Sequence, residues 1–427
     1  MRVLWLKSDL LLPLDSGGKL RTWHLLRQLA RHHEITYLAF AEARTPRALI
    51  DGMTEVASHV ETVPRAPRPK GSLRFYADAA AHALDRLPYA VGTYRSHAYR
   101  RRLNALLARK RFDVLVCDFL VPAVNLPDAL PCPAVLFTHN VESEIWRRHA
   151  DTQTVALRRM LFRAQHKKMQ RFEARALARF DGVLAVSDAD RLAFGRLYPH
   201  ALARPIQVVS TGVDTEYFAP AVGPADTGAD TSQSRELIFT GSMDWLPNED
   251  AMLYFAREIL PVLRAEDPRV HLSIVGRAPT PAVRKLAGDG VTVTGRVDDV
   301  RPFMRDAAVY VVPLRIGGGT RLKIFEAMAM GKAVVSTVIG AEGLPVTSDE
   351  QLVLADGPVE FARSVLDLLR NRDRRRRLER AARALVLDRF DWSVVARELE
   401  DALLGLARAP RQDAELSQSR VAECVLK

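Results

Sequence analysis

The stretch from Gly317 to Gly331, GGGTRLKIFEAMAMG, indicates the fold class of this chain. The apolar run at 308–314 (AVYVVPL) predicts a buried strand before it, and the apolar spacing from Leu322 to Met330 predicts a helix. Gly331 is placed to cap that helix at its C-terminal end. Strand, glycine turn and helix in this order form the repeating unit of parallel α/β sheets.

The same glycine turn favours a bound phosphate. Glycines let a ligand approach the backbone, and the N–H groups of the first helical turn attract anions. Arg321 and Lys323 lie in that turn, where positive charge is unfavourable for the helix unless an anion is bound. Glu326 is placed to reach a ligand hydroxyl. These features favour a sugar nucleotide, and the alternative is an ordinary turn with a solvated Arg and Lys.

Short apolar runs alternate with helical patterns along the rest of the chain. This alternation predicts an α/β protein with two parallel, doubly wound sheets. The expected strands of the first half are 3–6, 35–40, 114–117, 134–138 and 182–186. Those of the second half are 237–240, 272–275, 291–294, 309–312, 333–336 and 351–354.

A length of 427 residues also favours two domains. The polar stretch 221–235 marks a surface loop near their junction. We expect an N-terminal domain at 1–212 and a C-terminal domain at 213–390. A helix at 391–407 and a loose tail at 408–427 follow them.

The chain is basic, with 62 Lys and Arg against 51 Asp and Glu, a net charge of +11. Such a balance fits nucleic acid, an anionic membrane surface or anionic substrates. The basic segment 158–179 has a helical pattern and either lies on a membrane interface or is a core helix with a solvated basic face. No run of 18 apolar residues occurs, so no transmembrane helix is predicted. Three widely spaced cysteines suggest neither a disulfide framework nor a zinc site and fit a reducing cytosol.

Polar residues and glycines follow several expected strands, where ligands bind in open α/β sheets. Gly17 and Gly18, just before the first expected helix, suit a phosphate, a sugar or a close domain approach, or form a plain turn. His139 follows the strand at 134–138 and either hydrogen-bonds a sugar hydroxyl or is structural. Asp118, at the end of the neighbouring strand, has the same two interpretations.

The second half shows the same pattern at three strand ends. Gly241 and Gly276 allow close backbone approach, and Arg277 is placed to meet a phosphate. The segment 295–297 is placed to present backbone groups to a base.

Several enzyme classes lack support. The chain has no Gly-x-Gly-x-x-Gly after its first strand and no Walker A, His-Glu-x-x-His or Gly-x-Ser-x-Gly motif. Without an Asp-x-Asp motif or clustered Cys and His, a catalytic metal is not indicated. Nucleic acid is not expected as a partner either, because aromatic content is 7% and no recognition motif occurs.

Taken together, these segments resemble the GT-B glycosyltransferases of family 4 across nearly the whole chain. The matching segments occur in family order: 17–18, 138–140, 212–214, 217–218, 274–276, 295–297, 317–337 and 390–392. The amino-acid sequence at 241–251 and 317–344 is similar to that of sugar transferases of bacterial exopolysaccharide loci, including those associated with exosortase (PEP-CTERM) systems.

The resemblance implies two Rossmann-like domains that face a cleft, with the nucleotide-sugar donor on the C-terminal domain and the acceptor on the N-terminal domain. It implies retaining, metal-independent transfer of a hexose from a UDP- or GDP-linked sugar to a glycan or lipid-linked acceptor, without a cofactor. The setting would be exopolysaccharide or cell-surface polysaccharide synthesis in the cytoplasm, with the enzyme peripheral on the inner face of the plasma membrane.

By position, the resemblance gives His139 a place near the transferred sugar and gives donor contacts to Gly18, Val297, Gly319, Thr320 and Glu326. Together with the strand-end and glycine-turn features above, this predicts catalytic roles for His139, Arg321 and Lys323. It predicts donor-binding roles for Gly17, Gly18, Gly241, Arg277, Val297, Gly318, Gly319, Thr320 and Glu326. Among these, Glu326 would bond the ribose, and the backbone of Val297 would meet the base.

The chain departs from the family pattern at the donor phosphates. Gly318 stands where the family has a sugar-contacting glutamate, and Ser242 and Pro247 stand where it has Arg and Lys. Arg321, Lys323 and Arg277 are the expected substitutes. Two other interpretations stay open: a nucleotide-sugar epimerase of the same fold, and a non-catalytic basic binding protein.

Overall fold

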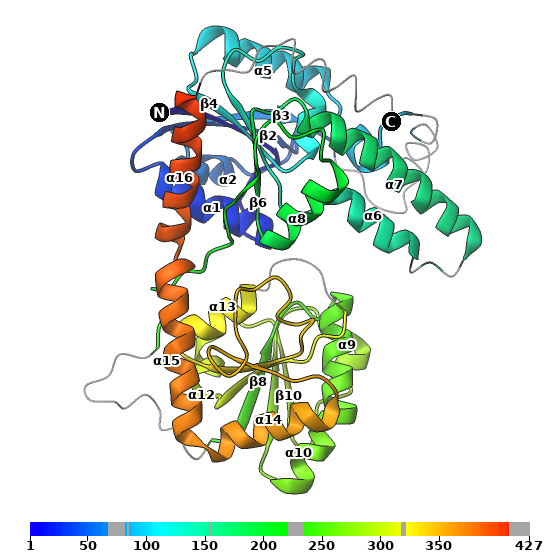
Figure 1. Cartoon of the computed structure of the whole chain (residues 1–427), viewed down its shortest axis with the longest axis vertical. Helices are drawn as coiled ribbons and strands as arrows, with labels where there is room; N and C mark the ends of the chain where they lie inside the picture. Colours follow the sequence, from blue (N-terminus) through cyan, green and yellow to red (C-terminus); the bar gives the residue numbers. More distant parts are fainter. Residues whose placement is uncertain are drawn as a thin grey trace. The chain divides into compact units, whose positions relative to one another are not determined.

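The computed structural model describes residues 1–66, 82, 85–151, 153, 155–220, 234–316 and 322–409. The chain forms two compact units, one of Met1–Ser210 with the segment from Ala396 onward, and one of Thr211–Val395 (Figure 1). The sequence predicts the junctions at 212 and 390. Most of the tail expected at 408–427 lies outside the described residues.

The first unit is built on a parallel sheet in the order β3-β2-β1-β4-β5-β6-β7. The strand order reverses at β1, where Val3 pairs with Ile35 of β2 and with Val114 of β4. Ligands of such sheets bind at this reversal, beyond the carboxyl ends of the strands. The strands are β1 (Arg2–Asp9), β2 (Glu34–Ala41), β3 (His59–Pro64), β4 (Val114–Asp118), β5 (Ala134–Phe137), β6 (Gly182–Ala185) and β7 (Gln207–Val208).

Helices connect these strands and cover the sheet. They are α1 (Gly17–Leu29), α2 (Arg47–Gly52), α4 (Tyr89–Gly92), α5 (His97–Arg109), α6 (Glu142–Asp151), α7 (Ala156–Leu177) and α8 (Asp188–Leu197), with the 3-10 turns η1 (Met53–Glu55) and η2 (Val121–Asn125). All five strands predicted for this unit are present. The two edge strands were missed, because β3 mixes polar with apolar residues and β7 has only two residues.

The second unit has its own parallel sheet, in the order β10-β9-β8-β11-β12-β13. Its strands are β8 (Glu236–Thr240), β9 (His271–Val275), β10 (Val291–Gly295), β11 (Val309–Val312), β12 (Ala333–Ser336) and β13 (Val353–Leu354). Its helices include α11 (Pro281–Arg284), α12 (Arg301–Asp306), α13 (Leu322–Ala329), α14 (Pro358–Arg370) and α15 (Arg372–Arg389), after which α16 (Trp392–Arg408) leads back into the first unit. The doubly wound α/β class predicted from the sequence is confirmed in both units.

The helical segment that follows β8 is interrupted by a π-helical turn. It consists of α9 (Leu246–Tyr254), the π-turn η3 (Phe255–Ile259) and α10 (Leu260–Glu266). Pro261 has no N–H group to donate, and its ring crowds the preceding turn. The helix therefore widens just before this proline.

The helix of the opening stretch is α13, and Gly331 caps it as predicted. Gly331 has a φ of 66°, and its N–H group donates to the carbonyl of Met328 at 2.9 Å. The N–H group of Lys332 donates to the carbonyl of Ala327 at 2.9 Å. These bonds satisfy the last carbonyls of the helix, and glycine adopts the left-handed conformation without strain.

The segments that lead into and out of the second unit pair with each other inside it. The N–H group of Val213 donates to the carbonyl of Phe390 at 2.7 Å, and that of Trp392 donates to the carbonyl of Val213 at 3.3 Å. A Cβ atom on Gly212 would lie 2.6 Å from the Trp392 ring. The matching segments at 212–214 and 390–392 are thus one structural joint.

Three glycines sit where β8, β9 and β10 end, and their backbones meet. The N–H group of Gly241 donates to the carbonyl of Val275 at 3.0 Å, and that of Gly276 donates to the carbonyl of Gly295 at 3.1 Å. A Cβ atom on Gly276 would lie 1.7 Å from the carbonyl oxygen of Gly241. No side chain fits there without moving the backbone.

Gly276→Ala should therefore destabilise the second unit by about 2–3 kcal/mol, through overpacking and backbone strain. Gly288→Ala is the matched control, because a Cβ atom there meets open space within 4 Å. Chemical unfolding of both variants is the measurement. Equal stabilities would contradict the account of this glycine edge.

Candidate active site

A buried carboxylate lies at the carboxyl end of β4 in the first unit. Asp118 is fully buried, and its Oδ2 atom accepts hydrogen bonds from Lys7 Nζ and Thr22 Oγ1, both at 2.6 Å. Trp5 Nε1 donates to the same oxygen at 3.1 Å. Burial alone would raise the pKa of Asp118, but the Lys7 charge and the contact with His139 outweigh it and hold that pKa well below its usual range. Asp118 is therefore ionised, and its partners offset the cost of burying its charge.

His139, just beyond β5, is held by this carboxylate. Its Nε2 atom lies 2.7 Å from Asp118 Oδ1, and its side chain is only 8% exposed. Burial lowers the pKa of His139 to about 3, so the imidazole is neutral at neutral pH. Because an ionised carboxylate only accepts, Nε2 carries the proton and Nδ1 is left as an acceptor. The ring is thus set to accept a hydrogen bond from a hydroxyl.

The Gly17–Gly18 turn meets His139 through Phe119. The Phe119 ring stacks on the imidazole, with centroids 3.7 Å apart and planes 11° apart. A Cβ atom on Gly18 would lie 2.8 Å from Phe119 Cζ, so only glycine lets α1 begin this close to the ring. Gly17 is exposed as the first residue of α1. The structure therefore gathers the two predicted glycines and the predicted histidine at one edge of the sheet.

Lys323 lies beside the glycine edge of the second unit. Its Nζ atom donates to Asn248 Oδ1 at 2.8 Å and lies 3.9 Å from the centroid of the Phe239 ring. A Cβ atom on Gly241 would come within 2.9 Å of the same Nζ. The lysine of α13 is thus fixed at the carboxyl end of β8.

Asn248 also links Lys323 to a second cation. Its Nδ2 atom donates to the carbonyl of Ser242 at 2.8 Å, and the hydroxyl of Ser242 accepts from Arg277 Nε at 2.9 Å. Arg277 is exposed, so its guanidinium is open to a ligand. The residue that stands in place of the family arginine therefore orients Arg277 instead. We name Lys323, Asn248, Ser242 and Arg277 the basic bridge.

Glu326 lies one turn beyond Lys323 on α13 and is half-buried. Burial raises its pKa to about 7, although the Lys323 charge opposes this rise. A partly desolvated carboxylate of this kind gains from hydroxyl donors, and perturbed carboxylates are common in functional sites.

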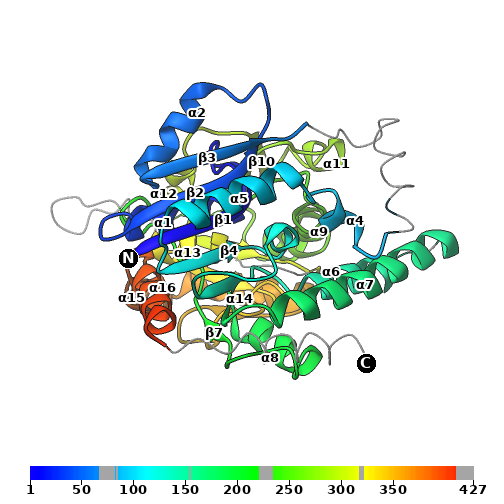
Figure 2. The same cartoon turned by 90° about the horizontal axis from the view of Figure 1, so that it is seen from above.

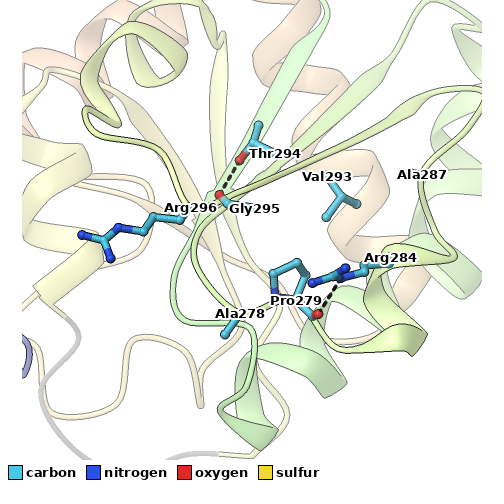
Figure 3. A pocket seen from close by; sticks show the side chains of 8 residues that line it. All are labelled: Ala278, Pro279, Arg284, Ala287, Val293, Thr294, Gly295 and Arg296. Carbon is cyan, nitrogen blue, oxygen red and sulfur yellow. Dashed lines mark hydrogen bonds between the residues drawn. The ribbon is translucent and has the colours of Figure 1, made fainter.

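A hollow of about 480 Å³ opens at the end of β10 (Figure 3). It is lined by Ala278, Pro279, Arg284, Ala287, Val293, Thr294, Gly295 and Arg296. Its size lies within the usual range of small-molecule sites. Figure 3 shows the Arg296 side chain directed away from Pro279 and Arg284. Val297, expected near a base, follows this segment and packs partly against the core of the second unit.

Four predicted site residues cannot be placed: Gly318, Gly319, Thr320 and Arg321 lie outside the described residues. Within the described ranges, no group of three or more His, Cys, Asp or Glu side chains is arranged to hold a metal ion. The same part of the chain contains no helix with the length and hydropathy needed to cross a membrane.

Four residues that shape the two sites were not predicted from the sequence: Lys7, Thr22, Phe119 and Asn248. The signal for Lys7 was a lysine within an otherwise apolar strand, which predicts a buried partner. Phe119 and Asn248 carry no local signal, because their roles depend on contacts with residues far away in the sequence.

The burial of His139 predicts how the free energy of unfolding changes at acid pH. In the unfolded chain an imidazole has a pKa of about 6.5, so between that pH and about 3 the unfolded state binds the extra proton and stability rises with pH. The stabilising contribution of the neutral His139 to the free energy of unfolding is present above about pH 6.5 and is lost as the pH falls below that value. His139→Gln should reduce the loss of unfolding free energy between about pH 7.5 and 5.5 by about 1 kcal/mol. Urea unfolding at both pH values tests this, and equal losses in both proteins would contradict a buried neutral histidine.

Two family descriptions match this chain. Residues 16–217 match the family described as Glycosyltransferase Family 4, and residues 234–371 match the family described as Glycosyl transferases group 1. The two matches follow the two halves of the chain and together cover well over half of it.

Individual proteins are similar over most of their length. The phosphatidyl-myo-inositol mannosyltransferase of Mycolicibacterium smegmatis is 29% identical over 358 residues, which are 80% of this chain and 84% of that protein. An uncharacterized 44.6 kDa protein in the cps region of Klebsiella pneumoniae is 21% identical over 383 residues, 87% of this chain and 91% of that protein. The crystal structure of Anabaena Alr3699/HepE in complex with UDP has a TM-score of 0.67 at 15% identity and covers 95% of this chain and 100% of that one. The chain therefore belongs to glycosyltransferase family 4 and is a glycosyltransferase of the GT-B fold.

Proposed function

We propose that this glycosyltransferase moves a hexose from a UDP- or GDP-linked sugar to a glycan or lipid-linked acceptor. The observation that carries the proposal is the basic bridge, which brings Lys323 and Arg277 to one strand edge of the second unit. Two cations at one strand edge suit the diphosphate of a nucleotide sugar. The Anabaena structure described as a complex with UDP supports this donor class, and the mannosyltransferase relative supports transfer of a hexose.

The proposed donor contacts follow the geometry of the second unit. The diphosphate lies against Gly241 and the basic bridge, and Glu326 accepts from a ribose hydroxyl. The hollow at the end of β10, beside Val297, is proposed for the base. The family resemblance adds Gly318, Gly319, Thr320 and Arg321 around the diphosphate.

In the first unit, Gly17 and Gly18 are proposed as backbone contacts of the donor phosphates. His139 is proposed to accept a hydrogen bond from a hydroxyl of the transferred sugar. Its neutral, fixed tautomer supports this role, because Nδ1 can only accept. Asp118 then acts as a positioning residue for His139.

The proposed transfer is retaining and metal-independent. The bond between the sugar C1 and the β-phosphate oxygen breaks, and the acceptor oxygen bonds C1 on the same face. The acceptor proton leaves with the nucleoside diphosphate. Negative charge grows on the departing phosphate, and preorganised cations stabilise it.

We propose synthesis of exopolysaccharide or another cell-surface polysaccharide as the setting, in the cytoplasm at the inner face of the plasma membrane. The relative in the Klebsiella cps region supports a polysaccharide role. The sequence resemblance of 241–251 and 317–344 to exopolysaccharide sugar transferases supports the same role independently.

The function is tested by incubating the protein with a panel of UDP- and GDP-sugars, with oligosaccharides and a bacterial lipid extract as acceptors. Mass spectrometry should detect a new glycoside and an equal amount of released nucleoside diphosphate. Conversion of the donor sugar into its epimer without acceptor would instead favour the epimerase interpretation.

Lys323→Gln should lower turnover about a hundredfold, because one preorganised contact to a developing anion is worth about 3 kcal/mol. Arg277→Gln should act in the same direction through the same diphosphate. Arg363→Gln is the matched control, an exposed cation on α14 of the same unit. Wild-type turnover in Lys323→Gln would contradict the proposed role of the basic bridge.

A further inference from the structure

The first half of α7 carries a surface that the proposed chemistry does not use. In Figures 1 and 2, α6 and α7 lie side by side, and the beginning of α7 extends away from the sheet of the first unit. Its length of 22 residues, from Ala156 to Leu177, lets the first turns project while the last turns reach the core.

The inner face of α7 is firmly anchored. Met169 and Ala176 are buried, and the Phe162 ring lies 5.9 Å from that of Trp146 on α6. The buried Glu173 carboxylate accepts from the N–H group of Glu142 at 2.8 Å and so caps the start of α6. The hairpin is therefore a fixed platform.

The outer face of the same helix is apolar at its beginning. Leu157, Met160 and Leu161 are 62%, 60% and 54% exposed, and Val155 just before the helix is 51% exposed. Positions 157, 160 and 161 share one face, because residues three and four apart are neighbours on a helix. That face is nearly opposite Phe162 and Met169, so these side chains cannot turn into the core. Four large apolar residues are exposed within seven positions, so they form a patch and are not isolated exposed side chains.

Basic side chains flank this patch without any acidic counterpart. Residues 156–172 contain six Arg and Lys and no Asp or Glu. On the helix surface, the exposed Arg158 lies on one side of the apolar face, and the exposed Arg163 and Lys167 lie on the other. The exposed Arg171 continues the apolar face toward the C-terminal end of the helix. An apolar stripe between basic borders is the pattern of helices that lie in a membrane interface.

We propose that residues 155–171 dock on an anionic lipid bilayer. A bilayer accepts both parts of this surface: the acyl boundary takes up Leu157, Met160 and Leu161, and anionic headgroups neutralise the flanking cations. A nucleic acid would leave the apolar side chains in water. The cytoplasmic leaflet has the required negative surface potential. That this surface presents the enzyme to a lipid-linked acceptor rests on the proposed function, whereas the docking itself does not.

The experiment is flotation of the full chain with phosphatidylcholine vesicles, with and without phosphatidylglycerol. The wild type should float only with phosphatidylglycerol vesicles, and less at high salt, because exposed charges are screened. The triple variant Arg163→Ser, Lys167→Ser, Arg171→Ser should bind roughly a hundredfold less tightly, at about fivefold per charge. The variant Leu157→Ser, Met160→Ser, Leu161→Ser should lose binding while it keeps every charge.

Matched controls separate this surface from net charge and from folding. Arg376→Ser, Arg377→Ser, Arg380→Ser removes the same charge from exposed positions of α15, and Leu192→Ser removes an isolated Leu that is 65% exposed. Both controls should bind as the wild type does. Absence of wild-type binding, or equal losses in the α7 and α15 triple variants, would overturn the proposal.

Turnover with a water-soluble oligosaccharide acceptor distinguishes the two proposals, since that reaction needs no lipid surface. All α7 variants should transfer sugar to this acceptor at the wild-type rate. Loss of vesicle binding with intact turnover in the α7 variants supports docking. Wild-type turnover without any vesicle binding removes docking alone, and vesicle binding without turnover removes the proposed function alone.

Discussion

Parallel strand direction is the constraint on which the two sites depend. In both sheets of the described chain every paired strand runs the same way, so the carboxyl ends of neighbouring strands meet at one edge. That edge brings Lys7 and Asp118 together across 111 positions of sequence, and Gly241 and Gly276 across 35. Helices begin at the same edge and add their N-terminal N–H groups. The fold therefore concentrates charge and helix N-termini at this edge before any particular substrate is considered.

Within this frame, the two units use charge differently. In the first unit the Asp118 charge is buried and fully partnered, and its effect is to fix the protonation and orientation of His139. In the second unit the cations of the basic bridge are only partly buried or exposed, so they remain able to meet a ligand anion. The first arrangement positions a neutral acceptor, and the second supplies positive charge. The transfer that we propose uses both, because the sugar hydroxyls must be oriented while the leaving diphosphate is stabilised.

Most strands of the two sheets could be predicted from the sequence, and the features that could not be predicted have a physical reason. Apolar runs predicted all central strands, since buried parallel strands are continuously hydrophobic, and the short or mixed edge strands β3 and β7 escaped. Gly18, Gly241, Lys323 and Glu326 were proposed as site residues from the glycine motif and from strand ends, and those roles remain predictions. The hydrogen bond between Ser242 and Arg277 was not predicted, because no local sequence pattern encodes a contact between two loops. The roles proposed for Gly318, Gly319, Thr320 and Arg321 remain predictions.

We propose above all that the basic bridge binds the donor through its diphosphate. The most direct test compares the affinities of the wild type and Lys323→Gln for a nucleoside, its monophosphate and its diphosphate by titration calorimetry, with the base that binds best. Wild-type affinity should rise with each phosphate, and Lys323→Gln should lose affinity for the diphosphate but not for the nucleoside. Equal weakening for all three ligands would contradict it, since the lysine would then support the fold of the site and not the phosphates.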